Sequence, residues 1–260
     1  MMVSWVYGFM GRRVAVAPFL GMGGLIVLRF LVDTSQAKLA GLMQRPLVCG
    51  QLITPLTGYS NAGEAFAIDN GAFSQFDSKK FKSILQRDEQ HKAKCLFVAV
   101  PDIVGNARRT LELWRCRHRF VKGWPLALVM QDGMEDFDIP WHDLQAVFIG
   151  GRDPWKDSQA SQDIVKTAKN LGVHVHVGRV NAYKRWKLFS DLGADTCDGS
   201  GIAMYDHMLK AIEERIEGNE RTLFDGEAAS EGISGGTHQR LQRPGGERLE
   251  GASDSDDAGG

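Results

Sequence analysis

Two carboxylates stand among glycines in the stretch GADTCDGSG, residues 193–201, just before a segment with helical character. An Asp before Gly is a common way to leave a strand, because the carboxylate accepts nearby backbone N–H groups in a turn. A carboxylate in such an open position can also act as a nucleophile, and a second carboxyl group can carry protons for it. Asp195 and Asp198 therefore belong either to a plain turn or to a reactive site.

The same arrangement recurs along the chain, where an acid, an amide or a bare glycine closes an apolar run. Each instance alone is explained by a turn, a kink or a helix cap. The recurrence at corresponding places favours one shared site over a series of unrelated turns. The positions are Asp69 and Asn70 in AIDNGAF, Asp102 in VAVPDIVG, Gln131 in LVMQDG, Gly150 and Gly151 in VFIGGRD, Gly178 and Arg179 in HVGRVN, and Asp198 in CDGSG.

These positions follow short runs rich in aliphatic residues, which the sequence predicts as strands. The runs cover residues 25–33, 47–54, 65–69, 95–102, 126–132, 146–151, 173–178 and 194–199. Helical patterns lie between or after them, over residues 78–92, 106–121, 161–172, 182–193 and 204–216, and several begin at Ser or Asn caps.

This alternation in a chain of 260 residues predicts an α/β protein, a single-domain (β/α)8 TIM barrel, with chemistry at the C-terminal ends of the strands. A doubly wound open sheet is the alternative, but no Gly-rich phosphate motif follows the first apolar run.

The barrel is expected over residues 28–217, between an N-terminal extension and a tail. Arg12 and Arg13 precede an apolar stretch and give it some likeness to a signal or an anchor, but Arg29 would be costly at membrane depth. We therefore interpret residues 1–27 as an extension that runs into a buried first strand. Residues 218–260 are acidic and rich in Gly and Ser, which predicts a disordered tail.

The composition is that of a soluble globular protein, with 43% hydrophobic and 24% charged residues and a formal net charge of −1. The four cysteines form no C-x-x-C pair, which indicates neither a zinc site nor a disulfide framework, and favours a cytoplasmic protein with no membrane partner. His174 and His176 alternate on one side of a strand, but no second H-x-H set accompanies them, so a metal-dependent hydrolase is not favoured.

The order of motifs D-N-G-A-F, P-D, Q, G-G, H-x-G and D-x-x-D-G resembles that of the tRNA-guanine transglycosylase superfamily. Within it, the chain is most similar to the short phage-type members and the deoxypurine-in-DNA protein A branch, over roughly Phe66 to Tyr205. The resemblance implies a (β/α)8 barrel and a pentosyltransferase that exchanges guanine for a 7-deazaguanine base in nucleic acid. It also implies that neither a redox cofactor nor ATP is needed, and it allows for an assisting partner protein.

By the same resemblance, Asp198 is the nucleophile and Asp69 the general acid/base. Phe73 would stack on the base, and Asn70, Asp102, Gln131 and the backbone at Gly150, Gly151 and Gly178 would bind it. The chemistry is consistent, since a carboxylate can trap the oxocarbenium-like state of glycosidic cleavage as a covalent intermediate. Because residues of odd separation face opposite sides of a strand, only Asp198 of the two acids is expected in the barrel mouth, and Asp195 is expected as a turn acid.

The resemblance favours DNA over tRNA as the substrate. The tRNA-modifying members hold zinc through a Cys-rich motif after the nucleophile, and no cysteine follows Cys197 here. No metal is therefore expected. Arg179, Lys184 and Arg185 could hold phosphates, or could form an ordinary solvated helix face. Trp155 and Lys156 are expected in a loop beyond a strand end, where they could contact an extruded nucleotide, although Trp155 could equally be a packing lid.

Three other functions use some of the same features. The exchange could act on tRNA. A hydrolytic N-glycosidase would use the same carboxylates but let water resolve the intermediate. A non-catalytic nucleic-acid-binding barrel would not explain why carboxylates gather where phosphates have to approach.

Overall fold

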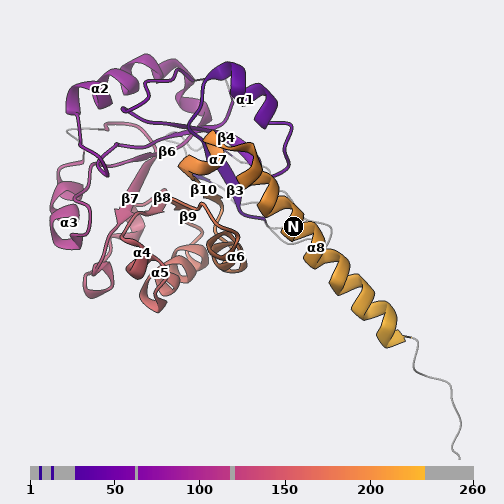
Figure 1. Ribbon diagram of the computed structural model, residues 1–260. Helices are drawn as coiled ribbons and strands as arrows, with labels where there is room; N and C mark the ends of the chain where they lie inside the picture. The colour runs from indigo at the N-terminus through magenta and orange to yellow at the C-terminus, as the bar shows by residue number, and fades with distance from the viewer. Residues whose placement is uncertain (1–5, 8–12, 15–26, 62–63, 118–120, 232–260) are drawn as a thin grey trace, which may run out of the picture. The chain divides into compact units, whose positions relative to one another are not determined.

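A computed structural model describes residues 6–7, 13–14, 27–61, 64–117 and 121–231 of the chain (Figure 1). The chain divides into two compact units, Met1–Glu217 and Gly218–Gly260. The first unit contains the site, and the boundary between the units coincides with the predicted end of the barrel.

The first unit is built around a closed barrel of eight parallel strands, as the sequence predicts. The order around the barrel is β10-β3-β4-β5-β6-β7-β8-β9, so each strand lies beside its neighbour in the chain and β10 closes the ring against β3. The strands are β3 (Arg29–Val32), β4 (Val48–Ile53), β5 (Phe66–Ile68), β6 (Cys95–Ala99), β7 (Leu126–Met130), β8 (Ala146–Ile149), β9 (His174–Val177) and β10 (Thr196–Cys197).

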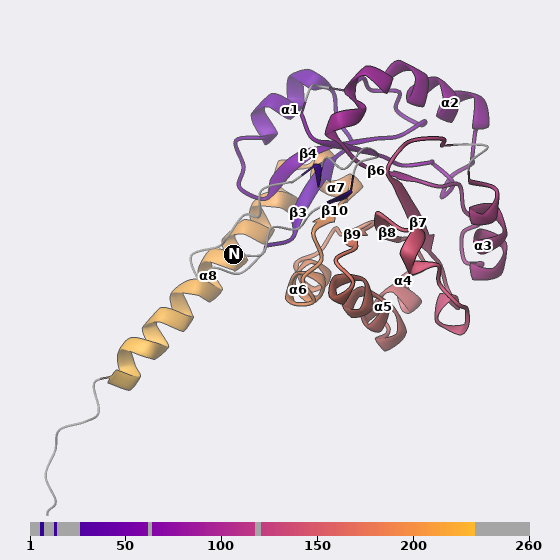
Figure 2. The same ribbon diagram turned by 180° about the vertical axis from the view of Figure 1, so that it is seen from behind.

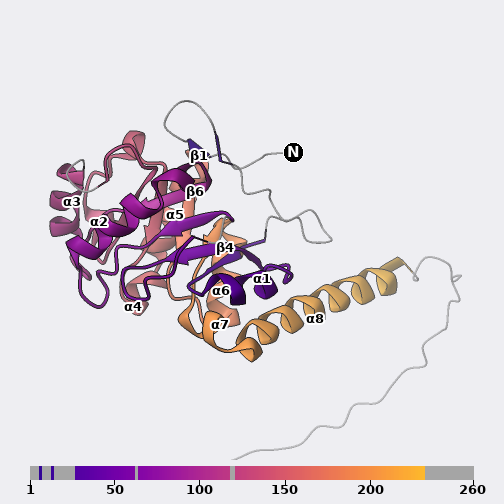
Figure 3. The same ribbon diagram turned by 90° about the horizontal axis from the view of Figure 1, so that it is seen from above.

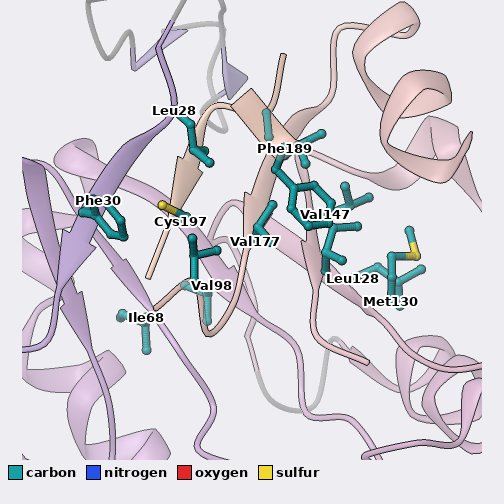
Figure 4. Packing of buried hydrophobic residues seen from close by; sticks show 14 of the residues in the cluster. Leu28, Phe30, Ile68, Val98, Leu128, Met130, Val147, Val177, Phe189 and Cys197 are labelled. Carbon is teal, nitrogen blue, oxygen red and sulfur yellow. The ribbon is translucent and has the colours of Figure 1, made fainter. Parts of the chain in front are cut away.

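Alternate residues of each strand face two different apolar layers, because successive side chains of a strand point to opposite faces. One layer joins the strands to the helices, and Figure 4 shows part of it, with Phe189 of a helix among residues of several strands. The other layer contains small residues such as Ala67, Ala127 and Ala146 together with the rings of Phe97 and Phe148. This second set fills the interior of the barrel, as side chains do in barrels of this size.

Helices lie around the strands, as the three views show (Figures 1, 2 and 3). Among the described residues, six α-helices lie between β3 and β10 in the chain. Caps and apolar spacing explain where they form. The Asn106 side chain accepts from the Arg109 N–H at the start of α3, and α3 buries residues 107, 110, 111 and 114, spaced as one helix face requires. The six are α1 (Gln36–Leu42), α2 (Ser78–Arg87), α3 (Ala107–Arg115), α4 (Asp153–Lys156), α5 (Gln159–Asn170) and α6 (Tyr183–Asp191).

Two connections of the barrel differ from the regular pattern. The described residues between β4 and β5 form turns, and the connection from β7 to β8 contains only the short 3-10 helices Met134–Asp136 and Trp141–Asp143. The sequence indicated no helix in either place. It did not indicate α1 and α4, which are the shortest of the six.

The chain beyond β10 forms α7 (Ser200–Met204) and α8 (Asp206–Glu231). The sequence predicts a disordered tail from residue 218; α8 as described continues through residues 218–231, and residues 232–260 lie outside the described part. Of the N-terminal extension, the structure describes an antiparallel pair, β1 (Val6–Tyr7) and β2 (Arg13–Val14). No helix within the described residues has both the length and the apolar character needed to cross a membrane.

Candidate active site

A pocket opens at the C-terminal ends of the barrel strands, and its walls come from β5, β6, β7, β8, β9 and β10 and the loops after them. It has about 430 Å³ of empty space, a figure that includes the open solvent at its mouth. The lining residues are Asp69, Asn70, Phe73, Asp102, Val104, Val129, Gln131, Phe148, Gly150, Gly178, Arg179 and Asp198.

Strand register explains why polar residues meet there. On β7, β8 and β9 every second side chain points into the barrel. Two residues after the last inward-pointing side chain of each strand, the chain has just left the strand, and the residues there are Gln131, Gly150 and Gly178. By the same two-residue step, Asp69 follows the inward-pointing Ala67 of β5, and Asp198 follows the inward-pointing Thr196 of β10. These five sequence-predicted positions therefore converge because they continue the interior face of the barrel to its rim.

Asp198 is held from both sides at the end of β10. Its Oδ2 lies 3.1 Å from His176 Nε2, and its Oδ1 accepts the Arg179 N–H over 3.2 Å. Arg179 adopts a left-handed φ of 61°, which is uncommon for a residue with a side chain, and this conformation directs its N–H to the carboxylate. The Asp198 side chain is 18% exposed, so it remains accessible from the pocket.

Asp69, beyond the end of β5, is a carboxyl group with a strongly altered proton affinity. Burial raises its pKa to about 7, and the negative charges of Asp198 and Asp102 act in the same direction. Backbone N–H groups of Gly71 and Asn70 oppose the increase. Asp69 can therefore exchange a proton near neutral pH while Asp198 stands nearby in the same pocket.

Asn70, Asp102 and Gln131 form a connected wall of hydrogen bonds. Asn70 Nδ2 donates to Asp102 Oδ1 over 2.8 Å, and Gln131 Nε2 donates to Asp102 Oδ2 over 2.7 Å. Gln131 Oε1 in turn accepts the Gly105 N–H over 2.8 Å. Burial raises the pKa of Asp102 to about 6, against the lowering effect of these two amides. The side chains are fixed before any ligand arrives.

The glycines of the site provide space rather than free N–H groups. We expected the backbone at Gly150 and Gly151 to contact a base, but both N–H groups donate to Met130 O, at 3.1 and 3.0 Å. Gly151 does not line the pocket and lies against Trp155, whose ring a Cβ there would meet at 2.2 Å. At Gly178 a Cβ would meet the Phe148 ring at 2.6 Å, so a bare backbone keeps the pocket open there.

Phe73 stands at the mouth of the pocket, with 60% of its surface exposed. The Arg179 guanidinium lies over its ring, 4.3 Å from the ring centroid, and its Nη2 donates to Gly151 O over 2.7 Å. An exposed aromatic ring with a cation on one face is suited to stacking on a planar ligand with the other.

Two of the residues expected at the nucleic acid are buried; for Trp155 the packing alternative fits, and Lys156 departs from the expected exposed position. Trp155 is 9% exposed, and its Nε1 donates to Glu135, so it packs as a lid over Gly151. Lys156 is fully buried and its Nζ donates to Gly178 O over 2.5 Å. Burial of Lys156 lowers its pKa to about 7, and the charges of Arg179 and Arg185 contribute.

The other basic residues lie outside the pocket. Lys184 is exposed, and Arg185 forms ion pairs with Asp153 and Asp157, which offset its charge. Together with Arg179 they line a second, open hollow beside the first. Of the predicted cations, Arg179 alone borders both hollows in the described structure.

Several groups at the site were not predicted. Asp33 follows β3 as Asp198 follows β10. Burial raises its pKa, hydrogen bonds from Thr57 and Thr54 oppose this, and the charge of Asp198 adds to it. The stretch LIVLRFLVD contained this signal, because an acid closes that run as well. His176 was noted only as a possible metal ligand, and nothing in the sequence indicated that it contacts Asp198.

Within the part of the chain that the structure describes, no cluster of three or more His, Cys, Asp or Glu side chains could hold a metal ion. All four cysteines are free thiols. Comparison of the sequence with protein-family models and with curated proteins finds no match.

Proposed function

We propose that this protein is a base-exchange transglycosylase that replaces guanine in DNA with a 7-deazaguanine base through a covalent Asp198 intermediate. The observation that carries the proposal is the meeting of two dissimilar carboxyl groups, Asp198 and Asp69, in one pocket that two amides and a third carboxyl group also line. The motif resemblance to the tRNA-guanine transglycosylase superfamily gives the reaction class.

In the first half of the reaction, an Asp198 oxygen attacks C1′ of the nucleotide as the C1′–N9 bond breaks. The electron pair of that bond leaves with guanine, and Asp69 donates the proton that the departing base requires. The product is an ester between C1′ and Asp198. Because the pKa of Asp69 is about 7, a substantial fraction of this group carries the proton at neutral pH.

In the second half, the incoming base occupies the same pocket and Asp69, now a carboxylate, removes its ring N–H proton. The nitrogen attacks C1′, the bond between C1′ and Asp198 breaks, and the electron pair returns to the carboxylate. Two displacements give net retention at C1′. The N–H donors on both Asp198 oxygens stabilise the carboxylate as it leaves.

The wall formed by Asn70, Asp102 and Gln131 suits the edge of guanine. Asp102 retains free lone pairs that can accept from ring and exocyclic N–H groups, and Gln131 Nε2 retains a second hydrogen for a carbonyl oxygen. Guanine and 7-deazaguanine have the same groups on this edge and differ at ring position 7. One fixed wall can therefore hold the outgoing and the incoming base in turn.

The choice of DNA rests on the sequence, which has no cysteine after Cys197 to form the zinc motif of the tRNA-modifying members. A base in a duplex has to leave the stack to reach a pocket at the rim of a barrel. Phe73, exposed at the mouth, offers a ring on which such a base can stack, and Arg179 offers a charge for the backbone.

The test is an incubation with DNA and tRNA, each carrying labelled guanine, with and without a 7-deazaguanine base. We expect label to leave DNA when the incoming base is present, and an enzyme–DNA adduct that persists on denaturing gels. Asp198→Asn should abolish the adduct, whereas Asp191→Asn, which removes an exposed carboxylate paired with Lys187 on α6, should not alter it.

Each other outcome points to a different function. Label lost from tRNA alone would reverse the substrate. Free guanine released without an incoming base would indicate a hydrolase. An adduct that persists in Asp198→Asn would identify another nucleophile.

A further inference from the structure

A line of polar side chains crosses the apolar interior of the barrel and ends at Asp198. His174 Nε2 lies 2.9 Å from Thr196 Oγ1, and His176 Nδ1 lies 2.9 Å from the same oxygen. His176 Nε2 lies 3.1 Å from Asp198 Oδ2. His174, His176 and Thr196 are almost completely buried, so water does not supply alternative partners.

The number of hydrogens on these groups decides which group donates in each hydrogen bond. A carboxylate only accepts, so His176 Nε2 has to carry a hydrogen, and the Nδ1 of a neutral ring is then an acceptor. The Thr196 hydroxyl has one hydrogen, which goes to His176 Nδ1. Thr196 Oγ1 then accepts from His174 Nε2–H. The remaining His174 nitrogen, Nδ1, lies 3.9 Å from Asp195 Oδ2, beyond hydrogen-bond distance.

The surroundings favour neutral imidazole rings. Burial lowers the pKa of His176, and the Lys156 charge acts in the same direction, against the raising effect of Asp198. Burial lowers the pKa of His174 to about 4, with Lys169 and His176 contributing and Asp195 opposing. The His176 ring also packs between the rings of Phe97 and Phe148, at centroid distances of 5.0 and 4.6 Å.

We propose that His176 is a positioning residue, which acts through Asp198 and is fixed in its Nε2–H tautomer by the Thr196 hydroxyl. The role rests on the proposed function of Asp198 as the nucleophile. His176 holds Oδ2 while the Arg179 N–H holds Oδ1, so the plane of the carboxylate is set before the nucleotide enters. His176 does not line the pocket, so its replacement removes no side chain that faces a bound substrate.

The proton arrangement can be tested without any activity, by nitrogen NMR of the histidine side chains in the full chain. The His176 signals are identified by their loss in His176→Gln. We expect a neutral ring with hydrogen on Nε2 at pH 8, because burial lowers the pKa of His176 below its ordinary value. In Asp198→Ala, where the acceptor is gone, the hydrogen should move to Nδ1 and donate to Thr196. A cationic His176, or an Nδ1–H tautomer in the wild type, would overturn the proposal.

The positioning role is tested by the rate of adduct formation with DNA. His176→Leu should lower the maximal rate about 100-fold, as a misdirected reacting group can, while the DNA concentration at half-maximal rate stays unchanged. His176→Gln, whose amide can donate to Asp198, should recover at least tenfold of that loss. Thr196→Val should lower the rate and Thr196→Ser should restore it. The rates are compared per folded molecule. If His176→Leu forms the adduct at the same maximal rate as wild type, the positioning role of His176 is refuted.

The two experiments separate this proposal from the proposed function. If the wild type forms no adduct with any nucleic acid, the proposed function fails, and the role of His176 in it fails as well. The NMR result would still decide whether the directed line of hydrogen bonds exists.

Discussion

At the scale of residues, Asp69 and Asp198 illustrate how the same side chain acquires different properties in one pocket. Asp198 accepts an N–H donor on each oxygen, whereas Asp69 faces two negative charges in a largely desolvated position. Pairs of titratable groups with contrasting environments are a common basis for dividing nucleophile from acid/base. The difference comes from what surrounds each carboxyl group and not from its place in a motif.

This environment predicts a pH-dependent stability effect at Asp69. The pKa is about 7 in the folded state, above the ordinary value of 3.8, so the folded protein binds this proton more tightly than the unfolded chain. The stabilising contribution is complete below about pH 4 and is lost as the pH rises through about 7. Asp69→Asn, which stays neutral, should therefore raise the melting temperature relative to wild type at pH 8, with little difference at pH 4.

Thermal unfolding followed by circular dichroism measures this difference, and the proposed function requires that the variant also lose base exchange. Asp77→Asn serves as a control with the opposite sign, because the pKa of this exposed helix cap is lowered by the N–H groups of Lys80 and Lys79. A melting temperature for Asp69→Asn below that of wild type at pH 8 would contradict the prediction.

The sequence could identify polar residues at strand ends, but it could not say which side chains are buried. Trp155 and Lys156 follow a strand end as Asp69 does, yet α4 turns both inward against Gly151 and Gly178. The alternation of His174 and His176 indicated that both side chains lie on the same face of a strand. It did not indicate whether that face points into the barrel or toward the helices. That information depends on the closure of the barrel, which no local pattern contains.

At the scale of elements, the strands were predictable because each combines an aliphatic run with a polar or glycine end. The eight runs correspond to the eight barrel strands, although the structural strands are shorter, β10 most of all. Helices α1 and α4 were missed because each is too short to display a helical period. The extension of α8 past residue 217 was missed because composition argued against packing there, and composition does not exclude a helix.

The ion pair between Lys169 of α5 and Asp195, just before β10, predicts a large loss of stability when Lys169 is replaced. Lys169 Nζ lies 2.7 Å from both oxygens of Asp195, which also accepts the Val175 N–H. Burial opposes the ionisation of Asp195, but His174 and Lys169 hold its pKa below the usual range. Lys169→Met leaves a buried carboxylate without its cation and should cost about 3–5 kcal/mol of unfolding free energy.

Urea denaturation at neutral pH measures the loss. Lys166→Met on the same helix removes an exposed pair with Asp163 and should change the free energy of unfolding by less than about 1 kcal/mol. A carboxyl group with a lowered pKa stabilises the folded state only while it is ionised, at pH values above that pKa. The contribution of Asp195 should therefore disappear in acid. Equal effects of Lys169→Met and Lys166→Met would show that the buried pair does not stabilise the barrel.

At the scale of the whole molecule, closure of the barrel is what assembles the candidate site. Asp69 and Asp198 are far apart in sequence, and β5 and β10 do not pair directly, yet both strands end at one rim. Closure also brings Asp33, beyond β3, near Asp198, and the negative charge of Asp198 contributes to the raised pKa of Asp33. The order of strands around the ring thus decides which carboxyl groups influence one another.

The division of the chain predicts that the site does not depend on residues beyond Glu217. The buried residues of α8, Leu209 and Ile212, and the Arg45 ion pairs with Asp206 and Glu213 all lie within the first unit. A protein that ends after Glu217 should keep its melting temperature within about 2 °C, which for a domain of this size corresponds to less than about 1 kcal/mol. It should also form the adduct with DNA at the rate of the full chain.

A protein that ends after Met204 is the matched control, because it loses the buried residues of α8 and both acids that pair with Arg45. It should melt well below the full chain, since removing two buried aliphatic side chains costs several kcal/mol. If the protein that ends after Glu217 melts as the full chain does but forms the adduct more slowly, then residues 218–260 contribute to nucleic-acid binding and the first unit alone does not account for the proposed function.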